Sequence, residues 1–344
     1  MLVDKTMFIA DVLDCDASVV VCCRPEGFGK SMNLSMLRAF LERPAVGRAG
    51  QRLFADAQIW DANGGRYRDE YACYPVISLD FSGAARCGAA VAGVVHNALS
   101  GECVRLLPLL EAPDLARDKV RHIERVARGA ASEDEVASVL GVLIELLEMA
   151  CDEQVVLLVD GYDAAWLGRA SARGASGADP AGLLDRVLFD AIATARDSLR
   201  LTCLMGECPG PAEAALSLHG CSYCLTTPLS TWCDRWFGFS DAEVQALLNH
   251  AGREEYLDDA REWLEGYRFG RAYCSNPARV IGFLDRGCTA PVHADLYGYA
   301  DCLSRVVAGW NLDRLSVLFD LLEAHGLSLI HISLQPCTRS MVPR

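Results

Sequence analysis

Three consecutive residues, Gly29, Lys30 and Ser31, carry the groups in this sequence that are best suited to bind phosphate. They follow a short apolar run over residues 18–23 and precede a helical pattern that begins near residue 32. A phosphate chain is bound by the backbone N–H groups of a glycine turn, by the positive end of a helix and by a lysine, while a hydroxyl serves Mg²⁺. We therefore predict a nucleotide phosphate site at this turn.

Each residue of the turn has an expected role. Glycines let the backbone approach the phosphates, Lys30 reaches the β- and γ-phosphates, and Ser31 ligates the metal. Arg24 occupies the position of the first glycine in the pattern G-x-x-x-x-G-K-[ST]. Gly-Lys-Ser also occurs at ordinary helix starts, but its place between an apolar strand and a helix favours phosphate binding. The predicted nucleotide-binding residues are Arg24, Gly27, Phe28, Gly29, Lys30 and Ser31.

A second chemical group ends another apolar run. Residues 155–160 read VVLLVD, so a predicted buried strand ends on Asp160. A carboxylate at this place holds Mg²⁺ in phosphate-binding folds. Strands of parallel sheets often end in Asp by chance, so Asp160 taken alone is better interpreted as having no metal-binding role. Taken together with the glycine turn, however, Asp160 predicts that it and Ser31 are the ligands of Mg²⁺.

The elements that must position these groups alternate between strand and helix. Helical patterns follow residue 32, cover residues 89–110, begin at the capping-box pair Ser132 and Glu135, and cover residues 183–195. Such alternation predicts an α/β fold, with a mostly parallel sheet and helices on both of its faces. The predicted strands are residues 18–23, 74–81, 155–160, 201–205 and 221–226.

The character of the sequence changes after residue 230. Beyond it we find helical patterns, at residues 244–249 and 256–267, and no convincing strand. We therefore expect a nucleotide-binding domain over residues 1–230 and a smaller, lid-like helical domain over residues 231–327. Residues 328–344 lack acids and periodicity and are interpreted as a tail, either disordered or foreign to the protein.

The charge, the apolar runs and the cysteines of the sequence disfavour several classes of protein. The net charge of −14 disfavours direct nucleic-acid binding, and no apolar run is long enough to span a membrane. Asp4 and Asp11 interrupt the first apolar stretch, which is therefore no signal peptide. The 16 cysteines are scattered, often inside apolar stretches, which favours buried thiols and a cytoplasmic location. The pair Cys221 and Cys224 lacks a second pair at zinc-binding spacing, and we interpret it as coincidental.

Several motifs in one order resemble the predicted AAA-ATPase-like family. They are VDKTMFIADVLD, RPEGFGKSMNLSMLRAFLE, LFADAQIW, YPVISLDFS, VVLLVDGYDAAW, WFGFSDAEV and WLEGYRFGRAYCSNPARVIGFL, which together span about residues 3–285. The resemblance implies a P-loop NTPase three-layer sandwich followed by a helical segment, with ATP as the ligand. Many family members continue into a PD-(D/E)XK nuclease-like domain, and no motif of that kind is present in this sequence.

The sequence departs from the family pattern at positions that matter for catalysis. Glu26 and Gly27 stand where the family has two arginines, which implies weaker binding of a triphosphate. Gly161 replaces the glutamate that follows the strand-ending aspartate and activates the attacking water. Met205 stands where a polar residue that senses the γ-phosphate is usual. The resemblance implies that hydrolysis is slow unless another acid, such as Asp163, takes over.

One arginine of the later motifs is a candidate for charge stabilisation. Arg268, in GYRFG, matches the family motif and could reach the nucleotide from the helical domain, or it could be a structural arginine in a glycine-flanked turn.

The leading hypothesis is an ATP-binding protein with weak Mg²⁺-dependent ATP hydrolysis, whose catalytic residues are Asp163 and Arg268. The alternative is a degenerate nucleotide-binding interaction module without turnover. The absence of a guanine-recognition motif favours ATP over GTP.

Overall fold

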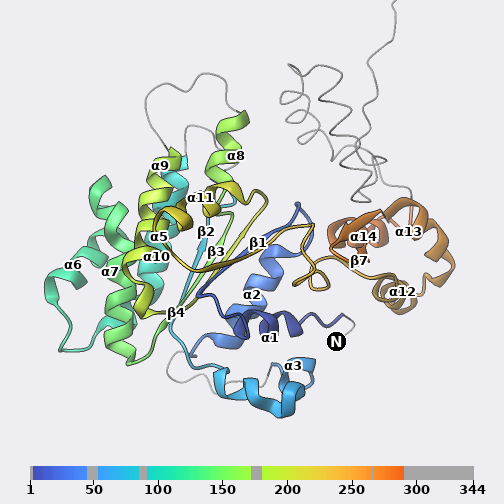
Figure 1. The fold of residues 1–344 in the computed structure, drawn as a ribbon, viewed down its shortest axis with the longest axis horizontal. Helices are drawn as coiled ribbons and strands as arrows, with labels where there is room; N and C mark the ends of the chain where they lie inside the picture. Colours follow the sequence, from blue (N-terminus) through green and yellow to red (C-terminus); the bar gives the residue numbers. More distant parts are fainter. Residues whose placement is uncertain (1–2, 45–52, 85–90, 172–179, 265, 290–344) are drawn as a thin grey trace, which may run out of the picture. The chain divides into compact units, whose positions relative to one another are not determined.

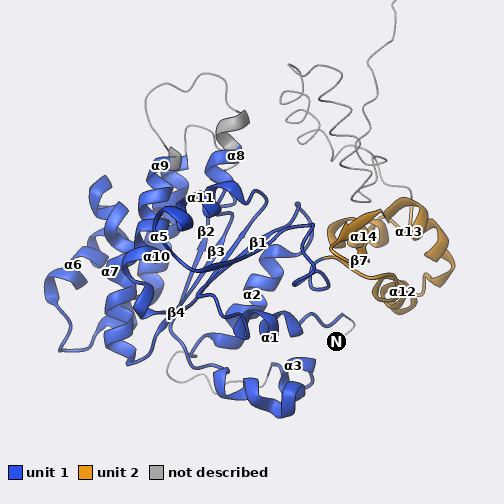
Figure 2. Cartoon of the chain, in the orientation of Figure 1, with its two compact units in different colours: residues 1–237 blue, residues 238–344 orange. Residues whose placement is uncertain are grey.

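The computed structural model describes residues 3–44, 53–84, 91–171, 180–264 and 266–289. The chain divides into two compact units, residues 1–237 and residues 238–344 (Figure 2). The domain limits expected from the sequence stay a prediction, and the expected tail over residues 328–344 lies outside the described residues.

Unit 1 contains a five-stranded parallel sheet with the strand order β2-β3-β4-β1-β5. All five strands lie on runs that the apolar pattern predicts, and the expectation of an α/β fold with a parallel sheet is confirmed. β4 is longer than predicted, since it begins before the apolar run. The strands are β1 Val19–Cys23, β2 Val76–Asp80, β3 Val155–Asp160, β4 Leu199–Gly206 and β5 Tyr223–Thr226.

Helices lie on both faces of this sheet (Figure 1). The α-helices of unit 1 within the described residues are α1 Met7–Leu13, α2 Lys30–Leu41, α3 Gln58–Asp61, α5 Val91–Leu106, α6 Arg117–Ala127, α7 Glu133–Cys151, α8 Ala164–Ser171, α9 Pro180–Leu184, α10 Asp190–Thr194 and α11 Gly210–Leu218. The 3₁₀ segments are η1 Ala62–Glu70, η3 Leu107–Leu110 and η5 Arg196–Ser198, and η4 Asp185–Phe189 is a π-helical turn.

The core of unit 1 follows from the apolar composition of the strands. β1 and β3 are buried along their whole length, because their side chains point alternately to two covered faces. Val21 and Leu157 belong to an apolar cluster that includes side chains from α5, α7 and α10. On the other face, α2 packs against β3 and β4. Each fully buried Val or Leu contributes roughly 1.5–3 kcal/mol to this packing.

The structure confirms the expected start of α7, but the helix expected over residues 183–195 is not continuous. Ser132 accepts a hydrogen bond from the backbone of Glu135, and the Glu135 side chain accepts one from the backbone of Ser132. These two bonds satisfy backbone donors that a helix start leaves without partners. The helix expected over residues 183–195 is instead divided into α9, η4 and α10. The apolar period does not distinguish such a π-turn from a continuous helix.

Unit 2 is smaller and is not purely helical. Its helices within the described residues are α12 Asp241–His250, α13 Leu257–Leu264 and α14 Pro277–Asp285, with a 3₁₀ segment η6 Glu254–Tyr256. They pack around a cluster that contains Val244, Leu264 and Phe283. The expectation of no strand is wrong, since β6 Tyr267–Phe269 and β7 Ala272–Cys274 form an antiparallel hairpin. Strands of three residues are too short to produce a recognisable alternation.

In the part of the chain that the structure describes, no helix combines the length and the apolar character needed to cross a membrane.

Every cysteine of the described ranges is a free thiol, and the apolar stretches place Cys22, Cys23 and Cys203 in the interior. Cys221 and Cys224 are half-buried, and the described residues contain no group of metal-ligating side chains around them.

Candidate functional site

The turn between β1 and α2 contains two glycines in the left-handed backbone conformation. Gly27 and Gly29 have φ values of 83° and 80°, in the left-handed region that side chains disfavour. Gly29 is also the residue that precedes α2, so the free N–H groups of the first helical turn begin directly after it. A Cβ atom on Gly29 would meet no atom within 4 Å, so conformation and not space requires glycine here.

Lys30 lies across this turn. Its Nζ donates hydrogen bonds to the carbonyl oxygens of Arg24 and Pro25, at 2.8 Å and 3.0 Å. The same ammonium group forms an ion pair with Glu207 Oε1 at 3.4 Å. The side chain of Lys30 is 12% exposed, so its charge is held within the site rather than in solvent.

The two predicted metal ligands are brought together by the fold. Ser31 Oγ donates a hydrogen bond to Asp160 Oδ2, although the two residues are 129 positions apart. Burial raises the pKa of Asp160, and the Asp80 carboxylate raises it further, while the hydrogen bond from Ser31 and the charge of Lys30 lower it. A hydroxyl and a carboxylate are the hard oxygen donors that Mg²⁺ accepts, and Mg²⁺ commonly takes its remaining ligands from water and phosphates.

Asp80 is a site residue that the sequence reasoning missed. It ends β2 and lies directly opposite Asp160 in the register of the sheet. The signal was available, since Asp80 ends a predicted strand in the same way as Asp160 does. Parallel strands bring such endings to one edge of the sheet.

Asp163, the predicted substitute for the missing glutamate, holds a backbone segment. It is 1% exposed, and its Oδ2 accepts hydrogen bonds from the backbone N–H groups of Glu207 and Cys208, at 2.8 Å and 2.5 Å. Burial raises its pKa, whereas these two hydrogen bonds and the charge of Lys30 lower it. Its geometry is that of a positioning residue, and its catalytic role stays a prediction.

We expect Asp163→Ala to lower the free energy of unfolding by about 2–4 kcal/mol, because the backbone N–H groups of Glu207 and Cys208 lose their charged acceptor. Asp163→Asn keeps an acceptor oxygen and should lose less than half of that amount. Urea denaturation followed by circular dichroism measures both values. Equal, small losses in the two variants would mean that the carboxylate does not hold residues 207 and 208 in place.

The side chain of Arg24, a predicted nucleotide ligand, lies in the interior of unit 1. Arg24 is completely buried, and its guanidinium donates to the Thr226 hydroxyl at 2.9 Å and to the carbonyl oxygen of Cys233 at 3.4 Å. It also lies over the ring of Phe237, 4.8 Å from the centroid. These contacts hold the guanidinium group of Arg24 in the interior, and its role as a nucleotide ligand stays a prediction. Phe28 is likewise buried, at 1% exposed, and anchors the turn in the core.

Gly161 is a glycine for a steric reason. Its φ is +67°, and a Cβ atom built on it would lie 2.6 Å from both the Cα and the N of Ser82. Its N–H donates to the carbonyl oxygen of Met205 at 2.8 Å, which fixes it between the ends of β2 and β4. This backbone has no room for the glutamate that the family pattern has at this position.

Glu207, which forms an ion pair with Lys30, is another residue that the sequence reasoning missed. It follows the end of β4, and its side chain is 24% exposed. Burial raises its pKa, the charge of Lys30 lowers it, and the Asp163 carboxylate raises it. Glu207 could have been proposed by the rule used for Asp160, since it directly follows a strand whose end meets the same edge of the sheet.

Arg268 lies on β6 in unit 2. Its Nε donates to the carbonyl oxygen of Gly270 at 3.0 Å, and its guanidinium carbon lies 5.5 Å from the centroid of the Tyr273 ring. These contacts hold the arginine within its own hairpin. A role in charge stabilisation stays a prediction.

The comparisons with known proteins give one match. The family model described as "Predicted AAA-ATPase" matches residues 1–208, which is more than half of the chain. The matched region includes β1 to β4, the glycine turn and the carboxylates at the edge of the sheet. Neither the curated proteins nor the solved structures give a match.

Proposed function

The chain belongs to the predicted AAA-ATPase family, and we propose on this basis that unit 1 has a P-loop NTPase fold and binds ATP with Mg²⁺. The observation that carries this proposal is the hydrogen bond between Ser31 and Asp160 beside Lys30, because it joins the predicted metal ligands at the start of α2. Two separate sequence signals meet there, the Gly-Lys-Ser turn and the aspartate that ends β3.

Each group would act in a defined way. The left-handed glycines and the first turn of α2 direct backbone N–H groups at the phosphates. Lys30 binds the β- and γ-phosphate oxygens, and Ser31 with Asp160 holds Mg²⁺. When bound, the metal neutralises charge on the phosphate oxygens. The protein thus contributes position and charge, which dominate catalysis of phosphoryl transfer.

For hydrolysis, the acid that orients water would be Glu207. It lies beside Lys30 and has a raised pKa, which suits a general base better than an ordinary carboxylate does. We therefore propose weak Mg²⁺-dependent ATP hydrolysis. The steric exclusion of an acid from position 161 favours the second candidate, a nucleotide-binding interaction module without turnover.

Replacing Glu207 with glutamine distinguishes these two candidates. We expect Glu207→Gln to lower phosphate release by about 100-fold, to the background of a Lys30→Ala variant, with ATP binding retained. In the wild type, turnover should rise with pH through the raised pKa of Glu207, because a base acts only when it is ionised.

The measurement is steady-state phosphate release against pH, beside calorimetric titration with a non-hydrolysable ATP analogue and Mg²⁺. Unchanged turnover in Glu207→Gln would exclude Glu207 as the base. Background rates in the wild type, together with retained binding, would favour the module without turnover.

A further inference from the structure

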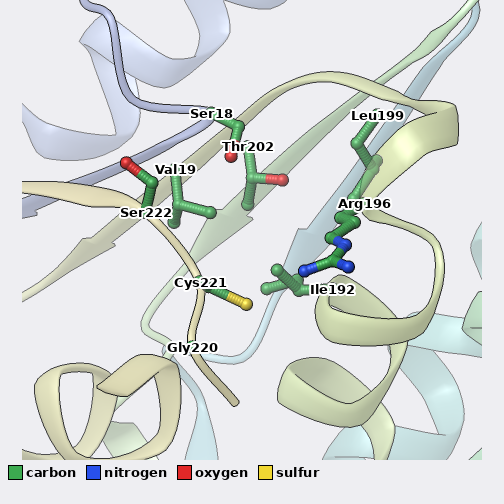
Figure 3. Close-up of a pocket in the computed structure, with 9 residues that line it drawn as sticks. All are labelled: Ser18, Val19, Ile192, Arg196, Leu199, Thr202, Gly220, Cys221 and Ser222. Carbon is green, nitrogen blue, oxygen red and sulfur yellow. The ribbon is translucent and has the colours of Figure 1, made fainter. Parts of the chain in front are cut away.

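A cavity of about 220 Å³ lies in unit 1 at the amino ends of β1, β4 and β5 (Figure 3). The glycine turn, Asp160 and Glu207 follow the carboxyl ends of the strands, so this cavity lies at the opposite end of the sheet. Its walls come from the strands, from α10, from η5 and from the segment between α11 and β5. It is lined by Ser18, Val19, Ile192, Arg196, Leu199, Thr202, Gly220, Cys221 and Ser222.

One lining residue has an unsatisfied polar group. Thr202 is completely buried, and its Oγ1 has no hydrogen-bond partner within the described part of the chain. Its backbone N–H is used, since it donates to the carbonyl oxygen of Ser18 at 2.8 Å. A buried hydroxyl without a hydrogen-bond partner destabilises the folded state and is uncommon in native proteins. A ligand atom that accepts a hydrogen bond from Thr202 would remove this cost.

Two further groups border the same space. Figure 3 shows the guanidinium of Arg196, the thiol of Cys221 and the hydroxyl of Thr202 around one opening. Arg196 is exposed at the mouth, and its charge lowers the pKa of the Cys221 thiol, although burial raises that pKa overall. A guanidinium donates two parallel hydrogen bonds that match a carboxylate.

The remaining wall is apolar. Val19, Ile192 and Leu199 are each 5% exposed or less and provide a surface for a hydrocarbon group. An apolar cavity of about 150 Å³ is sufficient to bind benzene, so this larger cavity has room for a ring or branched chain that carries one charged group.

From these observations we propose that the cavity binds a small organic carboxylate with an apolar body of about the size of a benzene ring. The carboxylate pairs with Arg196 at the mouth, one of its oxygens accepts the hydrogen bond from Thr202, and the apolar body lies against Val19 and Leu199. This site is independent of the nucleotide site and does not depend on the proposed function.

The test uses benzoate as the probe on the full chain, with benzyl alcohol as its neutral counterpart and inorganic phosphate as a bare oxyanion. Ligand-observed NMR titration gives the dissociation constants. We expect benzoate to bind at least about tenfold more tightly than benzyl alcohol, and inorganic phosphate not to displace it. Thr202→Val, which keeps the shape of the side chain, and Arg196→Gln should each weaken benzoate binding by about tenfold. Arg117→Gln, at an exposed position on α6, is the matched control and should bind as the wild type does.

A second readout tests the location. Benzoate should slow the alkylation of Cys221, measured by site-resolved mass spectrometry, and leave the half-buried Cys73 unaffected. Equal affinity for benzyl alcohol, displacement of benzoate by inorganic phosphate, or benzoate binding that persists in both variants would overturn the proposal. Since Arg196 is exposed, its variant should fold normally even if Thr202→Val did not.

Discussion

Replacing Lys30 with alanine is expected to abolish ATP binding. The ammonium of Lys30 is the cation of the glycine turn, and it contacts the carbonyl oxygens of Arg24 and Pro25 and the Glu207 carboxylate. On nucleotide binding it would form hydrogen bonds to two charged phosphates, each worth roughly 1.5–3 kcal/mol. Their loss, about 3 kcal/mol or more, corresponds to a decrease in affinity of at least about 100-fold.

Calorimetric titration with a non-hydrolysable ATP analogue and Mg²⁺ measures this decrease directly. Lys119→Ala is the matched control, because Lys119 lies on α6 and forms its ion pair with Glu145 of α7 and not with a residue of the glycine turn. Circular dichroism should show the same helical content for both variants. Wild-type affinity in Lys30→Ala would mean that the turn is not the phosphate site, and the family membership would then describe ancestry rather than activity.

Replacing Gly161 with alanine is expected to destabilise unit 1 by about 2–5 kcal/mol. A left-handed backbone costs a residue with a Cβ roughly 1–2 kcal/mol. Overpacking against a neighbour adds roughly 1–3 kcal/mol. That neighbour is the backbone of Ser82, only 2.6 Å from the added atom, and a backbone yields less readily than a side chain does.

Gly129 provides a control that isolates the steric part. Its φ is also +67°, but a Cβ atom there would meet nothing within 4 Å. We expect Gly129→Ala to cost only about 1 kcal/mol, the conformational part alone. Urea denaturation gives both free energies of unfolding. Similar losses in the two variants would show that the end of β2 moves aside easily, and an acid could then be introduced at position 161 to restore hydrolysis.

The sheet could be predicted from the sequence because its signal is local. Each strand is a short apolar run, and Asp160 ends one of them, so its place in the fold followed from the alternation of elements. The meeting of Ser31 and Asp160 at one edge is a consequence of that topology. The start of α7 was predictable for the same reason, since a capping box lies within four residues.

The details of the site depend on partners that are distant in the sequence. The side chain of Arg24, a predicted nucleotide ligand, donates to Thr226, 202 positions later. Asp163, a predicted catalytic residue, accepts hydrogen bonds from the backbone of Glu207 and Cys208. The hydrogen-bond partners of these two side chains cannot be predicted from the periodicity of the sequence or from the spacing of its motifs. A side chain adopts the environment that satisfies its charge, and that environment is known only once the chain has folded.

The ion pair between Lys30 and Glu207 has a consequence for how a nucleotide would enter the site. Because Lys30 already has an anion beside it, an incoming phosphate replaces that anion instead of meeting a bare cation. The free energy of binding is therefore a difference between two ion pairs, which limits affinity. The same exchange frees Glu207 from its counter-ion only when the phosphate has arrived. The proposed base would then become available in the presence of its substrate and stay neutralised without it.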